Sequence, residues 1–159
     1  MNRDFAEMLN ALADESVEYL VVGAYAVAGH GIPRATGDID LWVRPTPANA
    51  ARLWRALARF GAPRSRLTEA TFTQPDIVYQ IGLPPNRIDL LTTIDGVSFD
   101  EAWRDRVEGR IAGIPFQMLS KLHLIANKRA TGRPQDLADV ARLEGTEGEK
   151  EKTRQGDSK

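Results

Sequence analysis

Cysteine is absent from this 159-residue chain, and histidine occurs only twice, as His30 and His123. The first absence excludes disulfides, thiolate zinc sites and cysteine nucleophiles. The second excludes a histidine-rich metal centre. The chain also lacks the apolar run of roughly 18 residues that a membrane span needs, and its N-terminus lacks the apolar segment of a secretory signal. These absences lead us to expect a cytoplasmic protein with no membrane partner.

Charge of either sign is not in excess, since 21 Lys and Arg residues are balanced by 22 Asp and Glu residues. This balance argues against a protein that coats nucleic acid with a basic surface, although a local basic patch is compatible with it. Hydrophobic residues make up 42% of the chain and charged residues 27%, as in an ordinary globular domain. The length suits one domain with its own core.

Apolar periodicity and turn residues predict an α/β domain over residues 1–143, with a small mixed β-sheet flanked by helices. Strands are expected at 19–22, 38–43, 77–81, 87–92 and 110–114. Helices are expected at the N-terminus and at 24–28, 47–60, 67–72, 98–107, 121–130 and 134–143. Residues 144–159 have mixed charge and no hydrophobic residue, so we expect a disordered tail there.

Two aspartates in the predicted strand 38–43 carry the first functional signal. Side chains alternate along a strand, so Asp38 and Asp40 point to the same face, about 7 Å apart. Their charges repel each other, and aspartate is a poor strand former, so a bound divalent cation is the simplest compensation. Mg²⁺ takes oxygen ligands, usually from one or two carboxylates and the phosphates of a substrate.

A third carboxylate, Asp89, lies in the predicted strand 87–92. If this strand neighbours strand 38–43, the carboxylates of Asp38, Asp40 and Asp89 converge, as two-metal phosphoryl or nucleotidyl transfer requires. The simpler interpretation also stands at this point. An Asp-x-Asp pair arises by chance, and Asp38 can instead cap the loop that follows Gly37.

Gly23 stands between an apolar strand and a short helix, where backbone N–H groups can meet an anion. A tight turn explains this glycine equally well. The glycines do not fit the dinucleotide-binding fingerprint, and the chain has no Gly-Lys-Ser or Gly-Lys-Thr of a phosphate-binding P-loop.

Charged residues near the C-terminus have simple structural interpretations. Lys128 shares its helix with other basic residues, so it can belong to a solvated basic face. Asp136 and Asp139 lie in the first turns of the last helix, where carboxylates interact favourably with the helix dipole.

Taken together, these motifs resemble the nucleotidyltransferase superfamily of polymerase-β-like fold. The resemblance rests on Val21-Val22-Gly23-Ala24, on Arg34-Ala35-Thr36-Gly37-Asp38-Ile39-Asp40 and on Arg87-Ile88-Asp89-Leu90-Leu91. A later lysine followed by Gly-Arg-x-x-Asp, here Lys128 and Gly132-Arg133 with Asp136, is similar to the small bacterial and archaeal members related to abortive-infection and toxin–antitoxin enzymes. The match covers about residues 15–143.

The resemblance implies a role for each matching residue. Asp38, Asp40 and Asp89 would bind Mg²⁺ or Mn²⁺ and form the catalytic site, with Asp89 as a candidate general base. The implied nucleotide-binding residues are Gly23, Ala24, Arg34, Thr36, Lys128 and Asp136. One departure is Ala24, which replaces the usual second Gly or Ser and removes a hydroxyl that would bond a phosphate oxygen.

The function predicted on this basis is Mg²⁺-dependent transfer of a nucleoside monophosphate from an NTP, ATP included, to an acceptor, with release of pyrophosphate. The acceptor stays open among an RNA end, a protein and a small molecule. Two alternatives also stay open. One is a non-catalytic module that binds a nucleotide or a cognate partner protein, for instance within a toxin–antitoxin pair. The other is a metal-dependent phosphohydrolase that uses the same carboxylates.

Overall fold

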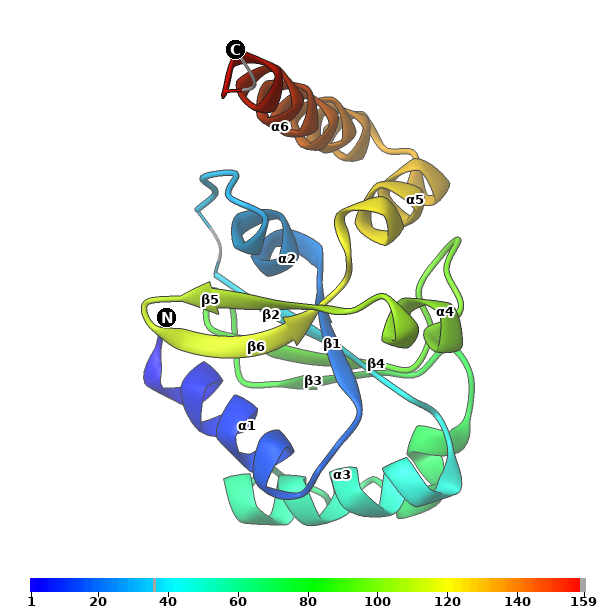
Figure 1. Ribbon diagram of the computed structural model, residues 1–159. Coiled ribbons are helices and arrows are strands. Elements are labelled where there is room, and N and C mark those ends of the chain that lie inside the picture. The colour runs from blue at the N-terminus through cyan, green and yellow to red at the C-terminus, as the bar shows by residue number, and fades with distance from the viewer. Residues whose placement is uncertain (36, 158–159) are drawn as a thin grey trace.

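The computed structural model describes the backbone of residues 1–35 and 37–157 and the side chains of residues 1–35 and 37–145. Its centre is a six-stranded sheet with the order β3-β4-β2-β1-β6-β5 (Figure 1). The strands are β1 (Tyr19–Val22), β2 (Ile39–Val43), β3 (Val78–Ile81), β4 (Ile88–Leu91), β5 (Val107–Ile111) and β6 (Ile114–Met118). Parallel pairs β2–β4 and β1–β6 alternate with antiparallel pairs, so the predicted mixed sheet is confirmed.

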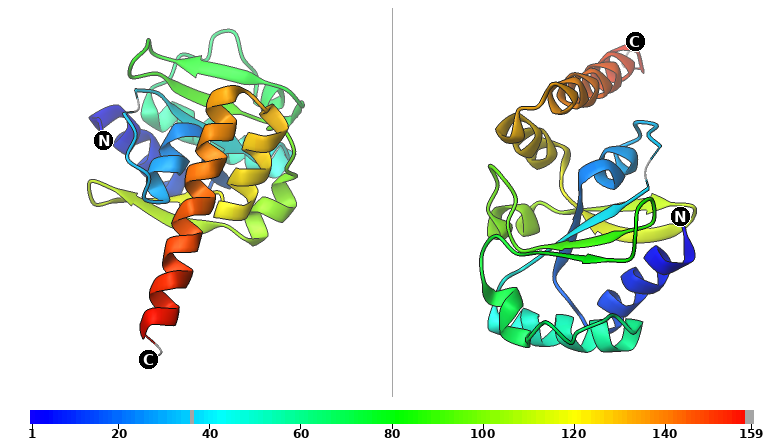
Figure 2. Two further views of the ribbon diagram at one scale, coloured as in Figure 1. Left: turned by 90° about the horizontal axis from the view of Figure 1, so that it is seen from above. Right: turned by 180° about the vertical axis from the view of Figure 1, so that it is seen from behind.

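Helices cover both faces of the sheet (Figures 1 and 2). On one face, α1 (Arg3–Asp14) packs against α3 (Pro47–Phe60). The other face carries α2 (Gly23–Gly29), α5 (Lys121–Thr131) and α6 (Pro134–Asp157), while α4 (Phe99–Arg104) and the 3₁₀ helix η1 (Glu69–Thr73) lie in the connections. Within the described residues, no helix is both long enough and apolar enough to span a membrane.

The core forms where the apolar face of each helix meets the central strands. In α1 the buried side chains of Phe5, Met8, Leu9 and Leu12 repeat at helical spacing. Leu20 on β1 and the neighbouring strands' apolar side chains are fully buried between the two helical layers. Burial on both faces fixes the relative positions of the central strands, and these strands carry the aspartates discussed below.

Capping residues set the ends of two helices where the sequence predicted them. The side chain of Thr46 accepts a hydrogen bond from the backbone of Asn49, and Pro47 begins α3. Ser120 likewise caps α5, which ends at Gly132. The predicted boundaries of these helices are confirmed to within one residue.

Two elements predicted between residues 98 and 114 are wrong in their boundaries. The helix expected to reach Val107 ends at Arg104, because the chain turns there into β5. The single strand expected at 110–114 is a hairpin of β5 and β6, which turns at Ala112 and Gly113. Alternation in this segment is interrupted by a two-residue turn, and the sequence alone did not distinguish that turn from a continuous strand.

The last helix is longer than predicted. Instead of ending near Leu143, α6 continues to Asp157, and Figure 2 shows its C-terminal part projecting beyond the rest of the molecule. The extra segment is rich in Glu and Lys, which are good helix formers, and contains no proline to end the helix. The division into a domain over residues 1–143 and a disordered charged tail over residues 144–159 stays a prediction.

Candidate active site

Two neighbouring parallel strands bring the predicted carboxylates together. In the register of β2 and β4, Asp40 lies directly opposite Asp89. Asp38 immediately precedes β2, and its Oδ1 accepts a hydrogen bond from the backbone N–H of Arg87, 3.0 Å away. The proximity of the two aspartate-bearing strands, which the sequence analysis could only suppose, is therefore confirmed.

Gly23, directly after the neighbouring strand β1, lies against the carboxylate of Asp40. It follows β1, whose last residue Val22 pairs with Asp40, and its φ of 67° is in the left-handed region. A Cβ atom at this position would lie 2.4 Å from Oδ2 of Asp40, closer than van der Waals contact allows. The glycine is required both by the turn and by the close approach of a carboxylate.

The electrostatics around Asp40 are unbalanced. The pKa of Asp40 is raised to about 6, chiefly by burial. The charge of the neighbouring Asp89, its hydrogen bond with Asp40 and the charge of Asp38 also contribute to this rise in pKa. Arg87 lowers the pKa of Asp40 only in part. Near neutral pH the cluster therefore carries negative charge that is not fully neutralised within the protein, and a divalent cation would compensate it.

Arg87 is the cation that already contacts the carboxylates. Its Nε lies 2.7 Å from Oδ1 of Asp89 and its Nη2 lies 3.1 Å from Oδ2, the two-pronged geometry of a strong Arg–carboxylate pair. The same Nη2 lies 3.6 Å from Oδ2 of Asp38. With this arrangement, no three His, Cys, Asp or Glu side chains among the described residues are positioned to hold a metal ion.

The residues present nevertheless fit a divalent cation. Three carboxylates from adjacent backbone segments supply the oxygen donors that Mg²⁺ and Mn²⁺ prefer. Burial, followed by the neighbouring carboxylates, raises the pKa of Asp40, which a bound cation would lower. Gly23 leaves open the space beside Asp40 that any side chain would fill. In the present arrangement the Arg87 side chain contacts the carboxylates of Asp38 and Asp89.

A cleft of about 240 Å³ begins at Asp40 and extends to α5. One wall consists of Val22, Gly23 and Asp40, and a second of residues that follow β4. The wall from α5 and the start of α6 includes Asn127, Lys128, Thr131, Arg133 and Asp136. Hollows of about 290, 430 and 530 Å³ lie elsewhere and contain none of the three aspartates, whereas Asp40 lines the cleft, so chemistry rather than volume identifies it.

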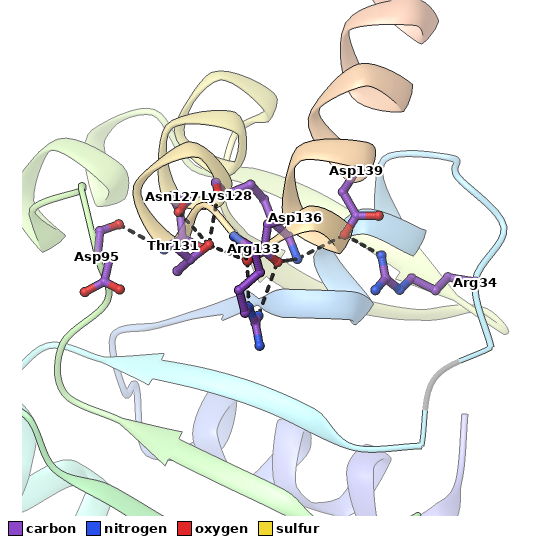
Figure 3. Close-up of polar contacts among 8 residues, drawn as sticks. All are labelled: Arg34, Asp95, Asn127, Lys128, Thr131, Arg133, Asp136 and Asp139. Atoms are coloured by element: carbon purple, nitrogen blue, oxygen red, sulfur yellow. Dashed lines mark hydrogen bonds and ion pairs between the residues drawn. The ribbon is translucent and has the colours of Figure 1, made fainter.

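Lys128 is held inside an ion-pair cluster at this wall (Figure 3). It is only 7% exposed, and its Nζ lies 3.5 Å from Oδ1 of Asp136 and 3.1 Å from Oδ2 of Asp139. The sequence-based interpretation of Lys128 as part of a solvated basic face is therefore wrong. A buried lysine requires such partners, because an unpaired buried charge is strongly unfavourable.

Asp136 is the anchor of the cluster and is fully buried. Arg133 donates to both of its oxygens, at 2.7 and 3.2 Å, and the Thr131 hydroxyl donates to Oδ2 at 2.8 Å. These hydrogen bonds, that of Arg133 above all, hold the pKa of Asp136 well below its usual range even though burial opposes them. Asp136 therefore stays ionised and orients both cations of the cleft wall.

Arg34 joins the same cluster from the loop before β2. Its Nη1 lies 2.5 Å from Oδ2 of Asp139, which is 4% exposed, so the loop is tied to α6 (Figure 3). Burial raises the pKa of Asp139, but the contacts with Arg34 and Lys128 outweigh it and lower the pKa overall. Helix-dipole stabilisation is thus not the main role of Asp139. Arg34 itself does not line the cleft.

The remaining predicted residues are placed as follows. Ala24 is the second residue of α2, directly after Gly23. Thr36 lies outside the described residues. Sequence reasoning missed two residues whose spacing offered a signal: Arg87 lies two positions before Asp89 and so shares its strand face, and Asp139 lies three positions after Asp136 on the same helix face.

Comparison with known proteins identifies the architecture. No protein-family model and no curated protein matches the chain. An inferred nucleotidyltransferase from Thermotoga maritima aligns over 96% of this chain and 92% of its own, with a TM-score of 0.55 and 16% sequence identity. The chain has a nucleotidyltransferase fold. The antibiotic-resistance factor ANT(2'')-Ia shares the nucleotidyltransferase fold over 98% of this chain and 95% of its own, with a TM-score of 0.54 and 14% identity.

This likeness confirms the nucleotidyltransferase fold that the sequence motifs predicted, and the narrower resemblance to abortive-infection and toxin–antitoxin enzymes stays a prediction. At 14% and 16% identity, the likeness establishes the fold and leaves the chemistry to be argued from the site.

Proposed function

We propose that this protein is a Mg²⁺-dependent nucleotidyltransferase that moves a nucleoside monophosphate from an NTP to an acceptor and releases pyrophosphate. One observation carries the proposal. Asp40 and Asp89 face each other across β2 and β4 beside a cleft whose far wall presents Lys128 and Arg133. The carboxylate of Asp40, which has Asp89 beside it on the next strand, and the cations for a triphosphate thus line a single cleft.

Asp38, Asp40 and Asp89 would hold Mg²⁺ or Mn²⁺. When bound, the metal would lower the pKa of an acceptor hydroxyl and offset the charge of the triphosphate. In the reaction the acceptor oxygen forms a bond to the α-phosphorus, and the bond between that phosphorus and the bridging oxygen breaks, so that pyrophosphate leaves. Asp89 is the proposed acceptor of the hydroxyl proton, a role for which its oxygens must first separate from Arg87.

The opposite wall of the cleft supplies the nucleotide-binding residues. Lys128 and Arg133 provide positive charge for the phosphates, and Asp136 fixes the position of both side chains. The backbone of Gly23 and Ala24 is proposed to face the phosphates from the other wall. Arg34 contributes through its ion pair with Asp139 on α6, and Thr36 stays a predicted nucleotide-binding residue.

Ala24 favours a second candidate, a nucleotide- or partner-binding module without turnover, such as half of a toxin–antitoxin pair. The hydroxyl that a serine would offer a phosphate is missing at this position. This candidate predicts nucleotide binding or a stable complex with a cognate protein, and no product from any NTP.

A transfer assay separates the two candidates. Purified protein is incubated with each α-³²P-labelled NTP, Mg²⁺ and, in separate reactions, total RNA, cell protein or small-molecule extract, and both pyrophosphate and labelled acceptor are measured. We expect activity that Asp38→Asn and Asp89→Asn abolish and that Asp14→Asn, an exposed α1 control, leaves unchanged. Full transfer by the two site variants would contradict the enzyme. Nucleotide binding without any product would support the non-catalytic module.

A further inference from the structure

Arg87 occupies the carboxylate cluster that the proposed function assigns to the metal. Its guanidinium contacts both oxygens of Asp89 and one oxygen of Asp38. The ion pair of Arg87 with Asp89 is partly shielded from solvent, since the side chain of Arg87 is 25% exposed and that of Asp89 is 10% exposed. A guanidinium and a divalent cation here would compete for the same oxygens and repel each other.

We propose that Arg87 is a displaceable internal cation that holds the carboxylates of Asp38 and Asp89 together in the metal-free protein and sets the affinity for the divalent ion. The inference rests on the proposed function and adds a residue to it. Arg87 is a positioning residue: in the metal-free state it offsets the repulsion between carboxylates that β2 and β4 force together. The divalent ion takes over this role when the guanidinium leaves.

Hydrogen bonds hold the backbone of Arg87 in place, so its side chain can move without the main chain. Its N–H donates to Asp38 Oδ1 at 3.0 Å, and its carbonyl accepts from the backbone N–H of Ile39 at 3.0 Å. These two bonds fix the main chain against the start of β2. The Arg87 side chain is itself 25% exposed, and the residues that precede it, 82–86, are all exposed, so it borders solvent. Displacement of the guanidinium therefore requires no change in strand register.

Metal binding in the absence of nucleotide tests the inference. Mn²⁺ titrations, followed by the electron paramagnetic resonance of free Mn²⁺, compare wild type with Arg87→Gln and with Arg55→Gln. Arg55 also pairs with a carboxylate, Glu15, but on α3, and therefore controls for the loss of one guanidinium. We expect Arg87→Gln to bind Mn²⁺ at least about tenfold more tightly than wild type, and Arg55→Gln to stay within about twofold. Unchanged or weaker binding by Arg87→Gln would overturn the inference.

The melting temperature provides a second readout of this test, and Arg87→Lys provides a second variant. Without metal, the melting temperature of Arg87→Gln should fall below that of Arg55→Gln, and Mn²⁺ should restore it. Arg87→Lys retains the charge but not the two-pronged geometry, so its Mn²⁺ affinity should lie between those of wild type and Arg87→Gln. If Arg87→Gln does not fold, an unchanged or lower Mn²⁺ affinity of Arg87→Lys is sufficient to reject the inference.

The result also separates this inference from the proposed function. Mn²⁺ binding by wild type that Asp89→Asn removes, with no gain in Arg87→Gln, overturns the role of Arg87 alone. Absence of Mn²⁺ binding in wild type and in both Arg87 variants overturns the metal site, and the metal-dependent reaction with it.

Discussion

Gly23 and Asp40 approach each other so closely that a methyl group on Gly23 would lie 2.4 Å from the Asp40 carboxylate. The end of β1 and the carboxylate of β2 are thus fitted to each other, and only glycine satisfies both the contact and the positive φ. This relationship places one wall of the cleft at a fixed distance from the proposed metal ligands.

Gly23→Ala should therefore remove metal binding out of proportion to its effect on folding. The added methyl must displace Asp40, so we expect at least a roughly tenfold loss of Mn²⁺ affinity and about 1–3 kcal/mol less free energy of unfolding. Gly31→Ala is the matched control, because Gly31 also has a positive φ, of 92°, but a Cβ there meets no atom within 4 Å. Equal losses of Mn²⁺ affinity in the two variants would show that backbone strain, not the contact with Asp40, is responsible.

The pKa of Asp40 predicts a specific pH dependence of stability. Burial and the neighbouring carboxylates raise this pKa from 3.8 to about 6, so the folded protein holds a proton that the unfolded chain releases earlier. In metal-free buffer, the free energy of unfolding contributed by Asp40 therefore falls as pH rises from about 4 to 6. Urea denaturation with EDTA should show wild type losing stability relative to Asp40→Asn across this window. A difference between the two proteins that does not change with pH contradicts the assignment.

Asp136 should be among the most costly residues to change in the C-terminal region. Asp136→Asn removes a fully buried carboxylate from Arg133 and from the buried Lys128, which keeps only Asp139 as a partner, so a loss of about 3 kcal/mol is expected. Glu144→Gln is a suitable comparison, because Glu144 pairs with Arg129 on the surface and should contribute less than about 1 kcal/mol. Chemical denaturation at pH 7 measures both. Similar small losses would mean that the cluster does not stabilise the fold.

Lys128 and Arg34 should differ in their effect on nucleotide binding. Lys128 lines the cleft, whereas Arg34 contacts Asp139 from the loop and does not line it. We expect Lys128→Met to weaken NTP binding at least about tenfold, and Arg34→Gln less than about threefold. Titration with a fluorescent NTP analogue in the presence of Mg²⁺ gives both values. A larger loss in Arg34→Gln than in Lys128→Met would place the triphosphate elsewhere.

Much of the fold and of the carboxylate cluster follows from local sequence signals. Alternation along the predicted strand 38–43 indicated that Asp38 and Asp40 lie close together, and cap residues such as Ser120 marked the helix ends. Such signals are local, since the physics of a strand face or a helix cap involves residues only a few positions apart. The proximity of Asp89 needed one further assumption, the pairing of β2 with β4, which the structure supplies.

Features that depend on tertiary placement were not predictable in the same way. The ion pair of Arg34 with Asp139 joins residues more than 100 positions apart, and no local pattern marks it. The burial of Lys128 depends equally on the packing of α5 against α6. By contrast, Arg87 was predictable in principle, since period-two alternation puts it on the strand face of Asp89.

Thermal unfolding with each NTP, with and without Mg²⁺, tests the central claim most directly. A ligand at 100 times its dissociation constant adds about 2.7 kcal/mol, which raises the melting temperature of a domain of this size by several degrees. We predict a Mg²⁺-dependent rise for wild type with at least one NTP, and its loss in Asp38→Asn. A rise of the same size in Asp38→Asn, or no rise with any nucleotide, would contradict a metal-dependent nucleotide site between Asp40 and Lys128.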